Sequence, residues 1–106
     1  MSYRWPEKDP DETADFSVDW SRFLGSDSLV SANWFIDDAD GTKTGPLSNG
    51  TTVNGLQFVA PTLSGNVATV RFGGGTNNAR YKVSCNITTA QGLNYERSVT
   101  LPVRDR

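Results

Sequence analysis

The stretch that decides the fold is RYKVSCNITTAQGLNYERSVTLPV, which runs from residue 80 to residue 103. In its first half, apolar side chains alternate strictly with polar ones, as in a strand with one face buried and the other in water. The second half repeats this alternation, and Arg97 is the only charge on its apolar face. Between the two halves, Gly92 can take the left-handed conformation that closes a short turn. The stretch therefore predicts a β-hairpin.

The rest of the chain repeats the period of two. Four more apolar series begin at Ala14, Val30, Leu56 and Ala68, and Pro61 is expected to end the third of them. The gaps between the series are rich in Gly, Asn, Asp and Pro, which are turn formers. SRFLGS is long enough for one helical turn at most. Six or seven short strands with these spacings predict an all-β fold, an antiparallel β-sandwich.

The chain divides into two unequal parts. Residues 1–12 have no period and contain Pro6 and Pro10, so they are expected to form an extended N-terminal arm. Residues 13–106 are expected to form the sandwich, and the length allows one domain. The core is expected to hold the following side chains of the strand series: Phe16, Val18, Trp20, Trp34, Tyr81, Val83, Val99 and Leu101.

The residue types that most catalytic and metal sites use are scarce. The 106 residues include no histidine and one cysteine, Cys85. This excludes a Ser-His-Asp or Cys-His triad, an internal disulfide and a multi-cysteine zinc site within the chain. Cys85 has apolar neighbours on its strand face and is expected to be a small buried hydrophobe. We therefore expect no enzymatic activity, no metal and no cofactor, and no run of apolar residues is long enough to predict a membrane span.

Two loops and one strand carry patterns that resemble known sites. In DDADG, Asp38, Asp40 and Gly41 echo a calcium loop, but the spacing of the glycine is wrong and no glutamate follows at the required distance. A polar hairpin tip is the favoured interpretation, and ion binding there stays open. GGGTNN leads into a strand, whereas a phosphate loop leads into a helix. Asp15 and Asp19 are about 13 Å apart along one strand face, too far for a glycosidase pair.

The charges are divided unevenly along the chain. Residues 1–40 hold ten acids and three bases, a net charge of −7, while residues 41–106 hold two acids and seven bases, a net charge of +5. The two halves can face each other within one fold. Alternatively, an acidic face of one copy meets a basic face of its neighbour, an arrangement that sets register and partner choice. Because the total charge is negative, we expect an acidic protein partner for the basic residues and no nucleic acid.

The N-terminal arm is predicted to be a protein interface. It combines aromatic side chains with charges of both signs, and aromatic residues are typical interface anchors. The predicted contact residues are Tyr3, Arg4, Trp5, Lys8, Asp9, Asp11 and Glu12. The alternative for Trp5 is that its side chain folds back onto its own sandwich.

Several segments, taken in order, resemble a family of small bacteriophage virion proteins, the phage fibre–tail adaptors. These segments are KDPDE, the strand that ends in Asp19-Trp20, LGSDSLVSANW, the glycines at 73–75, YKV and ITTAQG. The similarity covers nearly the whole chain except residues 37–54. It implies an immunoglobulin-like module without enzymatic activity, in which Trp34 is the core tryptophan and Tyr81 a tyrosine corner. The inter-sheet disulfide of immunoglobulins is absent because Cys85 has no partner.

The resemblance leads to a prediction of function. We expect a non-enzymatic, multi-copy structural protein of a phage particle that joins tail fibres to the head–tail or tail assembly. The expected partners are portal, tail or fibre proteins and copies of the chain itself. The expected location is the virion, after synthesis in the host cytoplasm. Two alternatives are a capsid decoration protein and a sugar-binding module that recognises the host.

Overall fold

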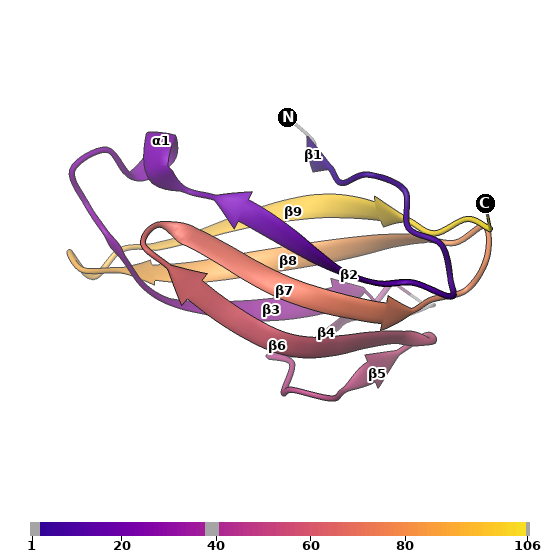
Figure 1. Cartoon of the computed structure of the whole chain (residues 1–106). Coiled ribbons are helices and arrows are strands. Elements are labelled where there is room, and N and C mark those ends of the chain that lie inside the picture. Colours follow the sequence, from indigo (N-terminus) through magenta and orange to yellow (C-terminus); the bar gives the residue numbers. More distant parts are fainter. Residues whose placement is uncertain (1–2, 38–40, 106) are drawn as a thin grey trace.

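The computed structural model describes residues 3–37 and 41–105, which form two β-sheets packed face to face (Figure 1). The first sheet has the strand order β1-β9-β8-β3-β4 and the second has the order β2-β7-β6-β5. The strands are β1 (Tyr3–Arg4), β2 (Thr13–Asp19), β3 (Leu29–Asp37), β4 (Lys43–Thr44), β5 (Thr52–Val53), β6 (Leu56–Ser64), β7 (Val67–Gly74), β8 (Arg80–Thr89) and β9 (Asn94–Pro102). The predicted all-β sandwich is confirmed, and SRFLGS contributes one helical turn, α1 (Ser21–Leu24).

The hairpin predicted over residues 80–103 is present. Strands β8 and β9 pair antiparallel from Arg80–Pro102 to Thr88–Asn94, and Gly92 closes their turn with φ of 81°. A second hairpin joins β5 to β6 through Asn54 and Gly55, which both have positive φ. Asn-Gly is the favoured pair for such a two-residue turn because both positions need left-handed backbone.

Two strands depart from the strict alternation. The pairing of β3 with β8 shifts register between Leu29 and Ser31, and Val30, which the period placed on the buried face, is 57% exposed. A bulge of this kind inserts one extra residue and turns it away from its expected face. In β6 the register shifts between Val59 and Thr62, so the strand continues beyond Pro61 instead of ending there. The bulge removes Pro61 from the hydrogen-bonded ladder in which its missing N–H would be costly.

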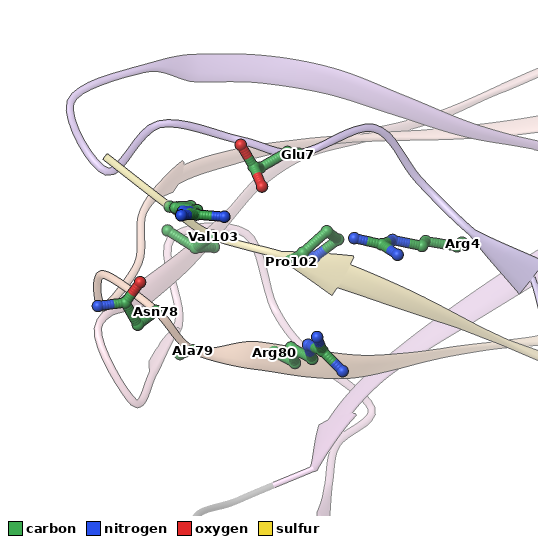
Figure 2. Close-up of a pocket in the computed structure, with 8 residues that line it drawn as sticks. Arg4, Glu7, Asn78, Ala79, Arg80, Pro102 and Val103 are labelled. Atoms are coloured by element: carbon green, nitrogen blue, oxygen red, sulfur yellow. The ribbon is translucent and has the colours of Figure 1, made fainter. Parts of the chain in front are cut away.

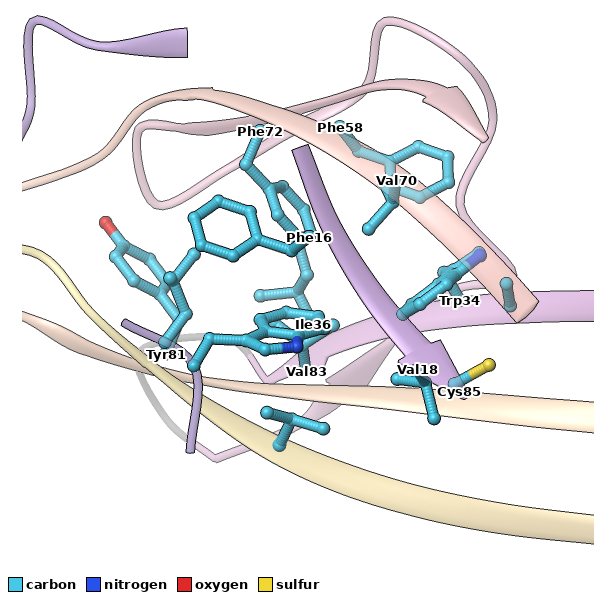
Figure 3. Packing of buried hydrophobic residues seen from close by; sticks show 14 of the residues in the cluster. Phe16, Val18, Trp34, Ile36, Phe58, Val70, Phe72, Tyr81, Val83 and Cys85 are labelled. Atoms are coloured by element: carbon cyan, nitrogen blue, oxygen red, sulfur yellow. The ribbon is translucent and has the colours of Figure 1, made fainter. Parts of the chain in front are cut away.

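The core fills the space between the sheets (Figure 3). All eight side chains that the sequence analysis placed in the core are buried, each with at most 7% of its surface exposed. Trp34 occupies a central position on β3, and Tyr81 reaches the opposite sheet. The Tyr81 hydroxyl donates to the carbonyl of Asn54 at 2.6 Å and accepts the backbone N–H of Thr76 at 2.9 Å. The bond between the Tyr81 hydroxyl and the backbone of Thr76, five residues upstream, has the geometry of a tyrosine corner.

Candidate interaction surfaces

The N-terminal segment lies along the sandwich instead of projecting from it. Strand β1 pairs parallel with β9, with Tyr3 opposite Val99 and Arg4 opposite Thr100. The Tyr3 side chain lies outside what the structure describes. Further along, the backbone N–H of Lys8 donates to Pro102 O at 3.0 Å, and that of Arg104 donates to Lys8 O at 2.8 Å. These bonds correct the expectation of an extended arm for this part of residues 1–12, because the segment adds an edge to the first sheet.

Trp5 is a core residue, which corrects its prediction as an anchor for a neighbour. Its side chain is 8% exposed, and its ring lies 5.1 Å from Phe16 and 6.1 Å from Phe72, centroid to centroid. The indole N–H donates to Ser17 O at 3.0 Å, so the polar end of the ring is satisfied as well. Burying a large aromatic surface with its N–H bonded is favourable. The alternative reading of Trp5, a side chain folded back on its own sandwich, is the one observed.

Lys8 is also buried, so its prediction as a contact residue needs the same correction. Its side chain is 1% exposed, and Nζ donates to Gly74 O at 2.6 Å and to Asp9 O at 2.9 Å. A buried ammonium requires such acceptors, since an unpaired buried charge is very costly. Burial lowers the pKa of Lys8, and the carboxylates of Glu12, Asp9 and Asp11 oppose this effect. Lys8 therefore fastens the N-terminal segment to the end of β7.

The segment after Lys8 folds into a compact turn, residues 9–12, which we call the acidic turn. The N–H of Asp9 donates to Glu12 Oε1 at 3.0 Å, and the N–H of Asp11 donates to Asp9 Oδ1 at 2.8 Å. A backbone bond from Glu12 N–H to Asp9 O at 3.0 Å closes the turn. Asp11 and Glu12 are exposed. Of the predicted contact residues with described side chains, Arg4, Asp11 and Glu12 remain exposed and Asp9 is half-buried.

Three arginines surround a shallow depression of about 160 Å³ at the same end of the molecule, which we call the basic socket. Arg4 comes from β1, Arg80 from β8 and Arg104 from the segment after β9, while Pro102 and Val103 form part of the lining (Figure 2). Among the described residues that line the socket, Glu7 is the one acid, so these residues carry three positive charges against one negative, a net +2. Arg80 and Lys82 share the solvent face of β8, as the alternation predicts. The grouping of Arg4 with Arg80 follows only from the pairing of β1 with β9.

The opposite end of the sandwich carries the exposed large apolar side chains. Among the described residues, the exposed large apolar side chains are Phe23 on α1, Val30 near the start of β3, Leu63 near the end of β6 and Leu93 in the β8–β9 turn. Their exposed fractions range from 42% to 57%. Figure 1 shows these elements at the left, away from the two chain ends. We call this surface the apolar end. The sequence does not predict this surface, because Val30 and Leu93 fit the buried face of the alternation.

An aromatic and cationic stack supports α1 at the apolar end. Phe23 meets Tyr95 edge to face at 4.7 Å and Trp20 at 5.6 Å, centroid to centroid. The guanidinium of Arg97, the one charge on the apolar face of β9, lies 4.6 Å from the Trp20 ring and 5.8 Å from the Phe23 ring. Cation–π attraction explains how this charge is accommodated on an otherwise apolar face.

Two carboxylates of β2, Asp15 and Asp19, have structural roles. Asp15 forms an exposed ion pair with Arg71 on the neighbouring strand, at 2.8 Å, and this contact lowers the pKa of the Asp15 carboxyl. Asp19 accepts the N–H of Ser21 at the start of α1, and hydrogen bonding there lowers its pKa too. Within the described residues, no group of His, Cys, Asp and Glu could hold a metal ion. Asp38 and Asp40, the candidate calcium loop, lie outside the described residues.

Cys85 is fully buried on the inner face of β8. Burial raises the pKa of its thiol to about 12 from 9.0, an effect that the nearby Trp20 and Arg97 side chains only partly offset. A rise of three units leaves about a thousandfold less thiolate at a given pH, and the thiolate is the reactive form.

We expect Cys85 in the native protein to resist a thiol reagent at pH 8 and to react readily after unfolding in guanidinium. The measurement is the absorbance released by a disulfide reagent in the two states. The unfolded thiol loses its proton near pH 9, whereas the folded thiol keeps it to about pH 12. The contribution of the neutral Cys85 thiol to the free energy of unfolding is therefore complete below pH 9, and it declines as the pH rises from 9 towards 12. Rapid labelling of native protein would contradict the burial of this side chain.

Comparison with known proteins assigns the family. The profile described as "Podophage GP4 fiber-tail adaptor protein gp77" matches residues 8–102, most of the chain. The chain belongs to this family. The family match includes the acidic turn and β2 to β9 of the sandwich but begins after Trp5. No curated protein matches the chain. Membership in the family supports a structural, non-enzymatic role in a phage particle.

Among solved structures, the solution structure of the PKD domain from KIAA 1837 protein is similar, with a TM-score of 0.50 and 17% identity. The similarity covers 100% of this chain and 83% of that domain. At such low identity it shows the fold alone, which is the immunoglobulin-like sandwich predicted from the sequence. None of the described helices is long and apolar enough to cross a membrane.

Proposed function

We propose that this adaptor is present in several copies per virion and joins tail fibres to the head–tail or tail assembly of a podophage. The observation that carries the proposal is the match of residues 8–102 to a fiber-tail adaptor family. Its partners are then portal, tail or fibre proteins and copies of itself. Synthesis takes place in the host cytoplasm and the mature protein stays in the particle.

The distribution of surface chemistry supports a bridging role. One end of the sandwich carries the basic socket and the acidic turn, while the other carries the apolar end. Exposed apolar side chains at one end of a molecule, with aromatic and arginine neighbours, have the composition of protein interfaces. A rigid two-sheet body between two chemically different ends can hold two partners at a fixed separation. The chain measures 41 Å along its longest axis.

Loss of this protein is expected to yield particles with filled heads and no fibres. The experiment supplies a phage that lacks the gene with the wild-type chain or with none, and counts fibres by cryo-electron microscopy and quantitative mass spectrometry. Density for the protein is expected at the tail vertex. Density spread over the shell would support capsid decoration instead, and fibres retained in normal number without the protein would refute the proposal.

A matched pair of variants in the β8–β9 turn tests the apolar end in the same experiment. Leu93→Asp places a charge on an exposed apolar residue, and Ala90→Asp adds the same charge to an exposed neighbour in the same turn. We expect Leu93→Asp to reduce fibre or adaptor copies per particle at least about tenfold, because a buried unpaired charge at an interface costs several kcal/mol. Ala90→Asp is expected to leave the copy numbers near the wild-type values. Equal effects of the two variants would exclude Leu93 from the interface.

A further inference from the structure

The arginines of the basic socket differ from three other cations of the protein, whose side chains have charged or aromatic partners. Lys43 pairs with Glu96, Arg71 pairs with Asp15, and Arg97 stacks on aromatic rings. Arg4, Arg80 and Arg104, in contrast, form no ion pair within residues 3–37 and 41–105. Three unpaired guanidinium groups around one depression repel one another, and an added carboxylate relieves this repulsion.

The backbone around the socket is held in place. Arg4 and Arg80 lie on paired strands, and the N–H of Arg104 is bound to Lys8 O. Below them, the N–H of Asn78 donates to Val103 O at 2.8 Å, and the N–H of Val103 donates to Ala79 O at 2.8 Å. The three arginine side chains therefore start from fixed backbone positions, and the depression of about 160 Å³ has room for the end of an acidic side chain.

The chain itself offers a fitting occupant in the acidic turn. Its own hydrogen bonds hold it rigid, and Asp11 is exposed at its tip. A rigid segment loses little conformational entropy when it binds. Within one copy, no ion pair joins the described side chains of the socket to Asp11. The turn and the socket lie at the same end of the sandwich but on different elements, so each is available to another copy.

We propose that the basic socket of one copy receives the acidic turn of a second copy, with Asp11 directed at Arg80 and Arg104. The contact is heterologous when each copy gives its turn to one neighbour and receives the turn of another in its socket. Contacts of this kind repeat from copy to copy and close into a ring when the rotation between copies allows it. The inference deepens the proposed multi-copy adaptor by naming the surface between its copies. Glu7 on the rim limits the strength of the contact in the wild-type protein.

The test measures self-association of the purified full chain by sedimentation velocity and native mass spectrometry, at about 0.01 M and about 1 M salt. The Debye length falls from about 30 Å to about 3 Å over this range, so an association based on these charges is strong at low salt and weak at high salt. We expect Arg80→Glu combined with Arg104→Glu to weaken it at low salt by at least about tenfold, since like charges then meet. Glu7→Gln is expected to strengthen it.

Two further variants make the test specific. Arg22→Glu makes the same type of charge change on α1 at the other end of the molecule and is expected to leave self-association unchanged. Asp11→Arg alone is expected to weaken it as well. When Asp11→Arg is mixed with the double variant Arg80→Glu and Arg104→Glu, the reversed charges attract again, so mixed oligomers are expected to form. Unfolding curves for each variant show whether the fold is intact.

The outcomes separate this inference from the proposed function. Wild-type protein that stays monomeric at low salt, association that does not depend on salt, or equal effects of the Arg80 and Arg22 variants would each overturn the turn-in-socket contact. Absence of mixed oligomers after the charge exchange would also overturn it. None of these results bears on whether fibres are lost without the protein, which the particle experiment decides.

Discussion

Replacement of Trp5 by alanine is expected to lower the free energy of unfolding by about 3–5 kcal/mol. The indole is 8% exposed, packs on Phe16 and Phe72, and donates a hydrogen bond to Ser17 O. Truncation leaves a cavity between the sheets and an acceptor without its donor. For a domain of about 100 residues, this loss lowers Tm by roughly 12 °C or more, which thermal unfolding followed by circular dichroism measures.

The neighbouring residue gives the matched control for Trp5. Arg4→Ala removes an exposed side chain at the adjacent position and is expected to change stability by about 0.5 kcal/mol at most. Trp5→Phe keeps an aromatic ring, and its loss of unfolding free energy is expected to lie between those of Trp5→Ala and Arg4→Ala. A Trp5→Ala protein with wild-type Tm that fails only to enter particles would mean that the side chain serves a neighbouring subunit, contrary to the burial described here.

Gly74→Ala is the second change with a large expected effect, a loss of about 2–4 kcal/mol. Gly74 has φ of 69°, which an L-residue adopts at a cost of about 1–2 kcal/mol. A Cβ at this position would lie 2.7 Å from Gly55 O, a backbone atom in the β5–β6 turn that also accepts the N–H of Gly75. Since Gly74 O also holds Lys8 Nζ, we expect the N-terminal segment to loosen together with the turn. Urea unfolding and faster amide exchange in residues 3–8 measure the two effects.

Gly73 provides the control for Gly74 at the adjacent position. A Cβ on Gly73 would meet the Thr13 hydroxyl at 3.2 Å, and that side chain can rotate away. The backbone of Gly73 is not left-handed. Gly73→Ala is therefore expected to change stability by less than about 1 kcal/mol. Similar losses for the two alanine variants would show that backbone strain at Gly74 is not the cause.

The alternation along the chain predicted the fold because every second residue of a strand with one buried face is apolar. Exceptions arose where a bulge breaks the period. Val30 fits the apolar face by position, but the register shift between Leu29 and Ser31 turns it into solvent. Nothing in the local sequence marks this shift, because it depends on how β3 matches β8.

The candidate surfaces were harder to predict than the core. The sequence identified the exposed acids Asp11 and Glu12 as candidate contact residues, and its alternation placed Arg80 and Lys82 on the solvent face of one strand. The sequence also placed Trp5 among the contact residues of the arm. Local composition does not show which part of the sandwich a segment packs on. The socket was missed because it joins Arg4 to Arg80, which are 76 positions apart in the chain and meet only through β9.

The sequence by itself determined the all-β class, most of the strands, the core and the absence of a histidine-based or multi-cysteine site. Those properties follow from residue types and short-range spacing, which are local. The tertiary structure decided that the N-terminal segment belongs to the sandwich and that Lys8 is buried. It also decided that Arg4, Arg80 and Arg104 gather at one end while the exposed large apolar side chains lie at the other. Those properties depend on which strands lie side by side, and strand pairing joins residues that the sequence separates.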